Sequence, residues 1–144
     1  MELSKKITEF LLLLLLTSAI MFLSLSPSSA VAPAVRMVGG DKIAHFLAYS
    51  ALGFWTFFSL GDVWSRLRSR YLRRYVISVV YCIVVGTVLE LIQPLFGRTT
   101  SVWDFAANTA GALLGTLAAL LILRTVSRRN AERTSREQPG GTSQ

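Results

Sequence analysis

Cysteine, histidine and charge are all scarce in this chain. Its 144 residues include a single cysteine, Cys82, and a single histidine, His45. A lone cysteine excludes an internal disulfide, and the lack of a Cys/His pattern excludes a structural zinc site of the finger type. Charged residues make up 16% of the chain, against roughly a quarter in a typical soluble domain, whereas hydrophobic residues make up 52%. Together with a mean hydropathy of +0.50, this composition indicates an integral membrane protein.

The hydrophobic residues gather in four long runs. A transmembrane helix needs about 20 mostly apolar residues to cross a hydrocarbon core of roughly 30 Å. Four segments approach this length, and none shows the alternation of a barrel strand. They cover about residues 7–25, 43–60, 75–93 and 105–123. We therefore predict an all-α integral membrane protein, with a bundle of four transmembrane helices in one domain, residues 1–129.

The first run has an alternative interpretation as a signal peptide. Lys5 and Lys6 precede it, and the small residues 30–32 (AVA) resemble a cleavage site. The apolar stretch is long for a signal peptide, however, and Pro27 and Pro33 flank the candidate site. Cleavage would also leave three spans, with the arginine-rich segments on opposite sides of the membrane. We expect the first run to be retained as a membrane anchor.

Basic residues are distributed unequally over the two sides of the predicted bundle. One side carries two lysines before the first span, five arginines between residues 66 and 74, and five between residues 124 and 136. The other side carries Arg36, Lys42 and Arg98. Because positive charge concentrates on the cytoplasmic side, we expect a multi-pass protein of the cell membrane with both termini cytoplasmic. The net charge of +7 arises from these segments, so we expect membrane lipids rather than nucleic acid as partners.

The last segment, residues 130–144, differs from the rest of the chain. It mixes charges with Pro139, Gly140 and Gly141 and has no apolar periodicity. Such a segment buries too little apolar surface to offset the entropy lost on ordering. We therefore expect a disordered, basic and polar cytoplasmic tail.

Polar residues gather where the predicted bundle faces away from the cytoplasm. They open the second span, close the third, occupy the turn after it and open the fourth. The set comprises Asp41, Lys42, His45, Glu90, Gln93, Arg98, Asp104 and Asn108. Spacings of three or four residues place pairs of them on shared helix faces. Because polar groups in or near a bilayer are costly, we predict that these side chains form an outward-facing ligand-binding site.

Some of these residues also have a structural explanation. Asp41 and Asp104 begin helices, where a carboxylate caps backbone N–H groups. A histidine such as His45, taken alone, is more often a hydrogen-bonded structural residue than a catalyst. Glu90 is harder to explain in this way, because it lies about one turn, or roughly 5 Å, inside its span. The set as a whole therefore favours a function, with capping as the alternative for its two aspartates.

Glycines mark candidate packing faces of the helices. Gly111 and Gly115 form a GxxxG pair in the fourth span, and Gly86 lies on the same face of the third span as Glu90. Small residues allow helix backbones to approach closely where lipid supplies no hydrophobic driving force. We expect all three glycines to serve helix packing, either within the bundle or, for Gly111 and Gly115, between copies in a homo-oligomer.

The ordered motifs resemble those of the VanZ-like family. They are DKIAHF at 41–46, ELIQ at 90–93, Arg98, and the series Ser101, Asp104, Asn108 and Gly111. The resemblance extends from LSLSP at 23–27 to the helix of Gly111 and Gly115. It implies a small polytopic bacterial membrane protein, in a family whose namesake is associated with resistance to the glycopeptide teicoplanin. It marks the same eight polar residues as important and gives none of them a catalytic role.

Binding of a headgroup is the function that we rank first. The polar site would hold an envelope lipid or a lipid-linked cell-wall precursor, with Lys42 and Arg98 contacting phosphate. A role in glycopeptide susceptibility would follow from such binding. A purely structural scaffold, whose polar ends satisfy one another, is a further alternative.

An enzyme acting on a lipid-linked substrate at the outer leaflet is the competing class. This hydrolase or transferase has His45, Glu90 and Asp104 as catalytic candidates, since imidazole and carboxylate groups exchange protons. A metal variant would bind an ion through His45 together with Asp41, Asp104 or Glu90. With one histidine in the chain, we expect no metal and no cofactor.

Overall fold

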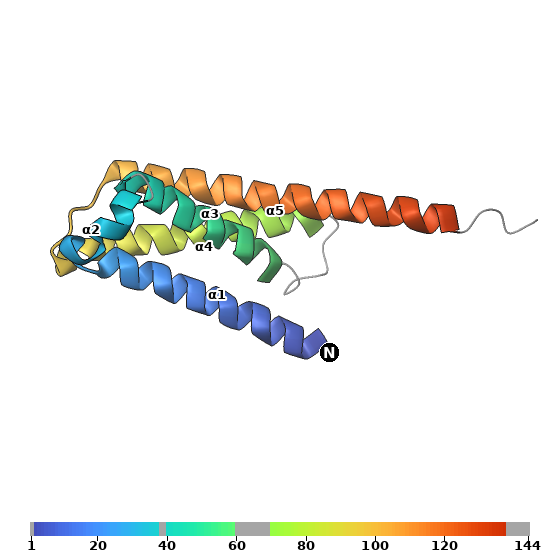
Figure 1. The fold of residues 1–144 in the computed structure, drawn as a ribbon, viewed down its shortest axis with the longest axis horizontal. Helices are drawn as coiled ribbons and strands as arrows, with labels where there is room; N and C mark the ends of the chain where they lie inside the picture. Colours follow the sequence, from blue (N-terminus) through green and yellow to red (C-terminus); the bar gives the residue numbers. More distant parts are fainter. Residues whose placement is uncertain (1, 38–39, 60–69, 138–144) are drawn as a thin grey trace, which may run out of the picture.

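The computed structural model describes residues 2–37, 40–59 and 70–137. These residues are helical, with no strand among them, which confirms the all-α prediction. The elements are α1 (Glu2–Leu25), α2 (Ser28–Met37), α3 (Asp41–Ser59), α4 (Arg70–Ile92), the 3-10 helix η1 (Gln93–Phe96) and α5 (Val102–Glu137) (Figure 1).

Within the described residues, three helices are long and apolar enough to cross a membrane. They contain the segments Leu3–Leu25, Tyr71–Phe96 and Val102–Ser135, which correspond to the first, third and fourth predicted spans. The second predicted span corresponds to α3, a helix of 19 residues whose first two turns carry Asp41, Lys42 and His45. These polar residues lower its hydropathy, so a membrane crossing by α3 stays a prediction. The chain is a helical membrane protein with three clear candidate spans.

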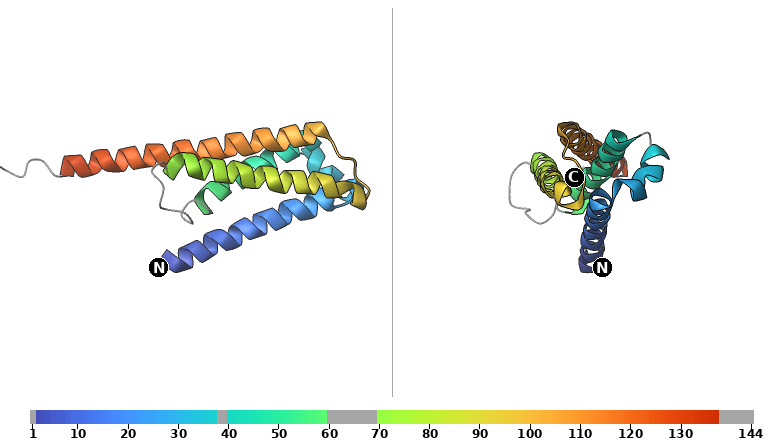
Figure 2. Two further views of the ribbon diagram at one scale, coloured as in Figure 1. Left: turned by 180° about the vertical axis from the view of Figure 1, so that it is seen from behind. Right: turned by 90° about the vertical axis from the view of Figure 1, so that its left-hand side faces the viewer.

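The helices form an elongated bundle in which α3, α4 and α5 run side by side (Figures 1 and 2). The short helix α2 and η1 lie at one end, near the C-terminal end of α1. Hydrogen bonds fix α1 to its neighbours: Thr17 meets the Tyr81 hydroxyl at 2.9 Å, and Trp55 Nε1 donates to the Glu9 carbonyl at 3.2 Å. The other end of the bundle is extended by α5, which continues well past the remaining helices (Figure 1).

Large apolar side chains cover much of the outside of the bundle. Phe22, Leu91 and Leu121, for example, are more than half exposed, on α1, α4 and α5 respectively. The interior is smaller and includes Tyr49, Leu52 and other fully buried side chains. An apolar exterior of this extent is a liability in water and suits contact with lipid. The distribution therefore agrees with a membrane location.

Helices α3 and α5 approach backbone to backbone. A Cβ atom on Gly111 would collide with the Phe46 carbonyl oxygen, and one on Gly115 with the Ser50 carbonyl oxygen. From the other side, a Cβ on Gly53 would lie 2.7 Å from Thr116 Oγ1. All three positions thus depend on the absence of a side chain.

The glycines of the predicted GxxxG pair therefore face a helix of the same chain. Gly86 similarly lies against the ring of Tyr49, where an added Cβ would sit 3.2 Å from Cε1. An oligomer through Gly111 and Gly115 stays a prediction, and it would have to replace the α3 contact that both glycines already make.

The end of α5 differs from the disordered tail that the sequence indicated. Residues 130–137 continue the helix to Glu137, and 138–144 lie outside the described residues. Ala131, Glu132 and Arg133 are good helix formers, and a helix already begun extends at little cost. We based the prediction of disorder on the high polarity of this segment. That polarity shows that the segment does not pack into a hydrophobic core, and it does not exclude a helix.

Replacing Gly115 by valine should destabilise the bundle, because the new Cβ would overlap the Ser50 carbonyl. Overpacking of this kind costs about 1–3 kcal/mol. We expect a clearly lower melting temperature for Gly115→Val in detergent, measured by circular dichroism. The matched control is Ala118→Val, which places the same residue on the exposed face of α5. Equal melting temperatures for the two variants would contradict the close α3–α5 contact.

Candidate functional site

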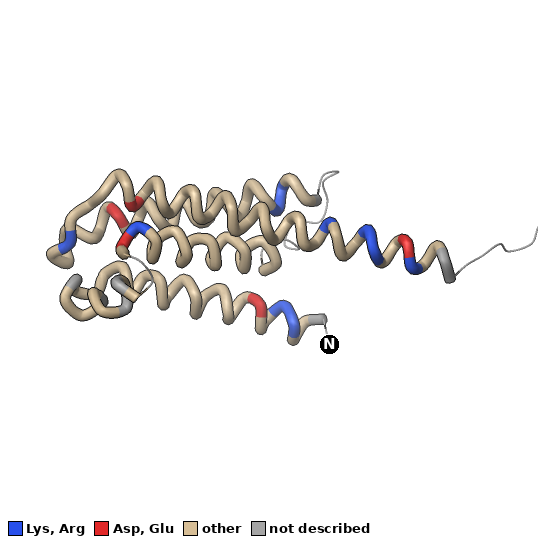
Figure 3. Tube along the Cα trace, turned by 45° about the horizontal axis from the view of Figure 1, so that its top comes forward, with Lys and Arg blue, Asp and Glu red and all other residues tan. Residues whose placement is uncertain are grey.

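Charged residues of the described chain lie at the two ends of the bundle, with an apolar middle between them (Figure 3). One end carries the polar residues singled out from the sequence. Five of their side chains are buried there, and that of Arg98 is 11% exposed. Asp41 is half-buried and Lys42 is exposed. The buried members are His45, Glu90, Gln93, Asp104 and Asn108.

The first turns of α3 and α5 bring a histidine and two carboxylates together. Asp41 and His45 are one turn apart on α3, with His45 Nε2 3.9 Å from Asp41 Oδ1. Asp104 lies in the first turn of α5. One ligand-type atom from each of these three residues lies within 4.8 Å of the other two. The close α3–α5 packing is what allows residues so far apart in the sequence to meet.

Asn108 fixes the orientation of the His45 ring. The Asn108 Oδ1 atom lies 2.9 Å from His45 Nδ1, in a buried contact. An amide oxygen only accepts hydrogen bonds, so His45 Nδ1 carries the proton and donates it. The other ring nitrogen, Nε2, lies on the side of Asp41 and keeps its lone pair. Asn108 and Asp104 are one turn apart on α5, which explains how one helix face contacts both His45 and its neighbours.

Glu90 connects the end of α4 to the beginning of α5. Its Oε2 atom accepts a hydrogen bond from the Ser101 backbone N–H at 3.3 Å, and its carbonyl accepts one from the Thr100 hydroxyl at 3.1 Å. A carboxylate near the first N–H groups of a helix also interacts favourably with the helix dipole. Glu90 Oε1, however, is buried without a hydrogen-bond partner. Glu90 therefore has a structural role through Oε2 and its carbonyl, whereas Oε1 has no partner within the described residues.

Gln93 and Arg98 hold the C-terminal end of α1. Gln93 Nε2 donates to the Ser24 carbonyl at 3.3 Å, and Arg98 Nη1 reaches the carbonyls of Leu23 and Ser26 at 3.5 and 3.4 Å. The last carbonyls of a helix lack partners within the helix, so these donors satisfy them. The sequence did not indicate this partnership, although the LSLSP segment belongs to the resemblance described above.

The position of Arg98 depends on the turn after η1. Gly97 has φ of 72°, a conformation that glycine adopts without strain, and its N–H bonds to the Pro94 carbonyl. From this turn the Arg98 side chain crosses to Asp41, with Nη2 3.5 Å from Asp41 Oδ1. Arg98 thus joins α1, α3 and the loop before α5.

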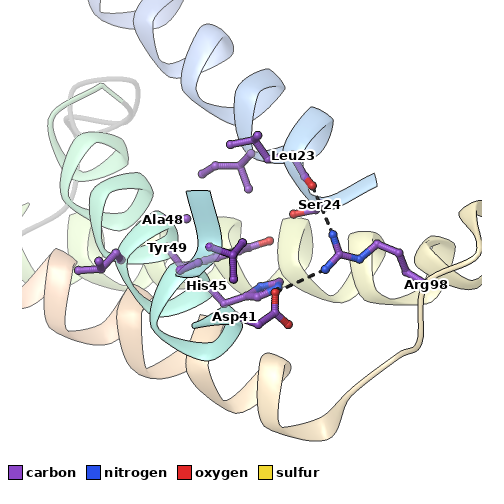
Figure 4. A pocket seen from close by; sticks show the side chains of 11 residues that line it. Leu23, Ser24, Asp41, His45, Ala48, Tyr49 and Arg98 are labelled. Carbon is purple, nitrogen blue, oxygen red and sulfur yellow. Dashed lines mark hydrogen bonds and ion pairs between the residues drawn. The ribbon is translucent and has the colours of Figure 1, made fainter. Parts of the chain in front are cut away.

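A cavity of about 240 Å³ opens beside these groups (Figure 4). It lies between the ends of α1, α2 and α3, with Arg98 closing one side. Its wall is mostly apolar and becomes polar where Asp41, His45 and Arg98 meet. The lining residues are Ile20, Leu23, Ser24, Val35, Asp41, Ala44, His45, Leu47, Ala48, Tyr49 and Arg98. Their apolar members, with Tyr49, were not candidates from the sequence, because nothing in their pattern distinguishes a cavity wall from a packed core.

Comparison with known proteins places this chain in a family. The VanZ/LLP1 family model matches residues 2–124, a range that includes every residue of the site. No curated protein and no solved structure matches the chain.

Removing the Asn108 side chain should leave the buried His45 Nδ1–H without an acceptor. The loss of a buried partner costs about 1–3 kcal/mol, so Asn108→Ala should melt at a lower temperature than the parent protein. Asn130→Ala is the matched control, because Asn130 is exposed on the same helix. The contact would be refuted if both alanine variants melted together with the parent in a detergent-based thermal assay.

Proposed function

The chain belongs to the VanZ/LLP1 family, and we propose that this member binds a membrane lipid with a phosphate-bearing headgroup at the end of its bundle. An envelope phospholipid and a lipid-linked cell-wall precursor share this chemistry. A precursor as the ligand would connect the protein to glycopeptide susceptibility, the property associated with the namesake of the family.

The amphiphilic cavity is the observation that carries the proposal. Ile20, Leu23 and Leu47 belong to the part of its wall that suits a hydrocarbon chain, whereas Asp41 and Arg98 stand at its polar side. Binding pockets of this kind combine apolar walls with a few polar groups that orient the ligand. A lipid with a charged headgroup has the same division between an apolar and a polar part.

Arg98 is the candidate phosphate ligand. Its guanidinium contacts the carbonyls of Leu23 and Ser26 and the carboxylate of Asp41, all at 3.4–3.5 Å, which is long for a hydrogen bond. A phosphate oxygen is a stronger acceptor for arginine than a carbonyl, and two of them bind the planar guanidinium together. A phosphate would therefore replace the two long carbonyl contacts, while Arg98 keeps its ion pair with Asp41. Lys42, exposed at the start of α3, supplies a second cation in the same turn as Asp41.

Charge distribution supports an outward-facing site. The end of the bundle opposite the site carries Lys5, Lys6 and the arginines at the start of α4 and along the end of α5 (Figure 3). Arg124 lies over the Tyr71 ring at 5.6 Å, so the end of α5 and the start of α4 share this side. Positive charge favours the cytoplasm. Both termini are then cytoplasmic, and the cavity opens toward the outer leaflet.

Catalysis on the same lipid is the second candidate function. The observation that favours it is the cluster of the His45 ring with the carboxylates of Asp41 and Asp104, in which His45 and Asp41 line the cavity. An imidazole between carboxylates is a recurring arrangement for moving a proton. Under this alternative the protein is a hydrolase or transferase, and the lipid inventory of the host changes when the protein is expressed.

The orientation is tested by introducing one additional cysteine at a time and labelling it with a membrane-impermeant maleimide. Met37 is 89% exposed at the end of the bundle that holds the site, and Ser135 is exposed near the end of α5. We expect Met37→Cys to react in spheroplasts and Ser135→Cys to react only after permeabilisation. The parent chain is the background control, since Cys82 is fully buried. Labelling in the reverse pattern would overturn the orientation.

Lipid binding is tested by native mass spectrometry of the purified protein and its variants. The parent should retain a phosphate-bearing lipid, and its fragment masses distinguish a phospholipid from a polyprenyl phosphate. Ala44→Phe fills the cavity and Arg98→Gln removes the charge, so both should reduce bound lipid several-fold.

The matched controls for this experiment place the same substitutions elsewhere. Ala118→Phe and Arg128→Gln alter exposed positions of α5 away from the cavity and should retain lipid as the parent does. Equal retention in all four variants would contradict the proposal. Arg98→Gln also removes the hydrogen bonds to the end of α1 and could reduce lipid binding by displacing that helix. Ala44→Phe leaves these hydrogen bonds in place and therefore tests the cavity separately.

A further inference from the structure

We propose that Asp41, His45 and Asp104 form a binding site for a divalent transition-metal ion, with Zn²⁺ as the representative. The site goes beyond lipid binding and does not depend on it. It also differs from the expectation that one histidine is too few for a metal, because the two carboxylates that complete the set come from separate helices.

The distances suit an ion with small adjustments of the side chains. One atom from each residue lies within 4.8 Å of the other two. Ligands about 2.1 Å from a zinc ion stand roughly 3.4–4.2 Å apart. Asp41 and His45 share a helix face and Asp104 approaches from α5, so rotation of the side chains closes the remaining gap. One imidazole and two carboxylates are a donor set that zinc and its neighbours accept.

A buried oxygen without a partner is the second observation. Asp104 is 6% exposed, and its Oδ1 atom makes no hydrogen bond. A buried carboxylate oxygen that nothing pairs is costly. The same carboxylate takes part in the three-residue cluster, so a bound cation would satisfy it.

The His45 ring already has the arrangement of a metal ligand. Its Nδ1–H donates to Asn108 at 2.9 Å, which leaves the lone pair of Nε2 on the side of Asp41, 3.9 Å from Oδ1. Metal-binding histidines usually donate their other N–H to such an outer partner, which fixes the ring. Asn108 would have this supporting role.

The balance of charge also favours a cation. Asp41, Glu90 and Asp104 bring three carboxylates to this end of the bundle, and among the described residues the cation in contact with them is Arg98, which pairs with Asp41. Lys42 is exposed to solvent. A divalent ion would offset the negative charge of Asp104, a buried carboxylate that water screens little. Three protein ligands leave a coordination position open, and Asp41 and His45 both line the cavity.

The test is a titration of the purified full-length protein with ZnCl₂ after removal of metals by a chelator. We expect one equivalent to bind, by calorimetry and by elemental analysis after desalting. His45→Gln and Asp104→Asn should weaken binding roughly tenfold or more, and Asn108→Ala should weaken it through the ring orientation. Glu132→Gln is the control, since it neutralises an exposed carboxylate on the same helix as Asp104.

A second measurement needs no variant. X-ray absorption at the zinc edge of the loaded parent protein should show one imidazole with oxygen ligands. No zinc binding, binding that His45→Gln leaves unchanged, or a spectrum without imidazole would overturn the proposal. The titration contains no added lipid, so a protein that retains no lipid and still binds zinc would refute only the lipid proposal.

Discussion

The close approach of α3 and α5 is the contact on which the site depends. Gly111 and Gly115 place the backbone of α5 directly on that of α3 near Phe46 and Ser50. In lipid, apolar side chains gain little by meeting one another, so such tight packing is a main source of helix association. It fixes the distance at which the first turns of both helices meet. His45 reaches Asn108 and the aspartates only because no side chain separates the two helices at this level.

Helix ends determine most of the remaining polar contacts. A helix that ends near a membrane leaves carbonyl or N–H groups that lipid cannot satisfy. Arg98 and Gln93 supply donors to the last carbonyls of α1, and Glu90 accepts from the first turn region of α5 through Ser101. These residues tie three segments into one end of the bundle. The residues of the candidate site are thus also residues that position the helices.

The sequence predicted the features that depend on local pattern. Runs of apolar residues located α1, α4 and α5, and the cost of polar groups in lipid pointed to the eight side chains at one end. What the sequence did not predict depends on which helices meet. The pairing of His45 with Asn108, the support of α1 by Arg98 and the contact of Gly111 with the α3 backbone join residues far apart in the chain. Residues 130–137 are helical because helix propensity acts even without a core.

Incomplete pairing of buried carboxylate oxygens is the observation that favours a ligand site over a scaffold. If the polar end served only to hold helices together, its buried oxygens would find partners within the bundle, as most buried polar groups do. Asn108, Gln93 and Arg98 follow this rule. Asp104 Oδ1 and Glu90 Oε1 do not, although both are buried at the same end of the bundle. Two unpaired buried carboxylate oxygens lower the stability of the fold, and a cation or a donor group from a ligand would offset that cost.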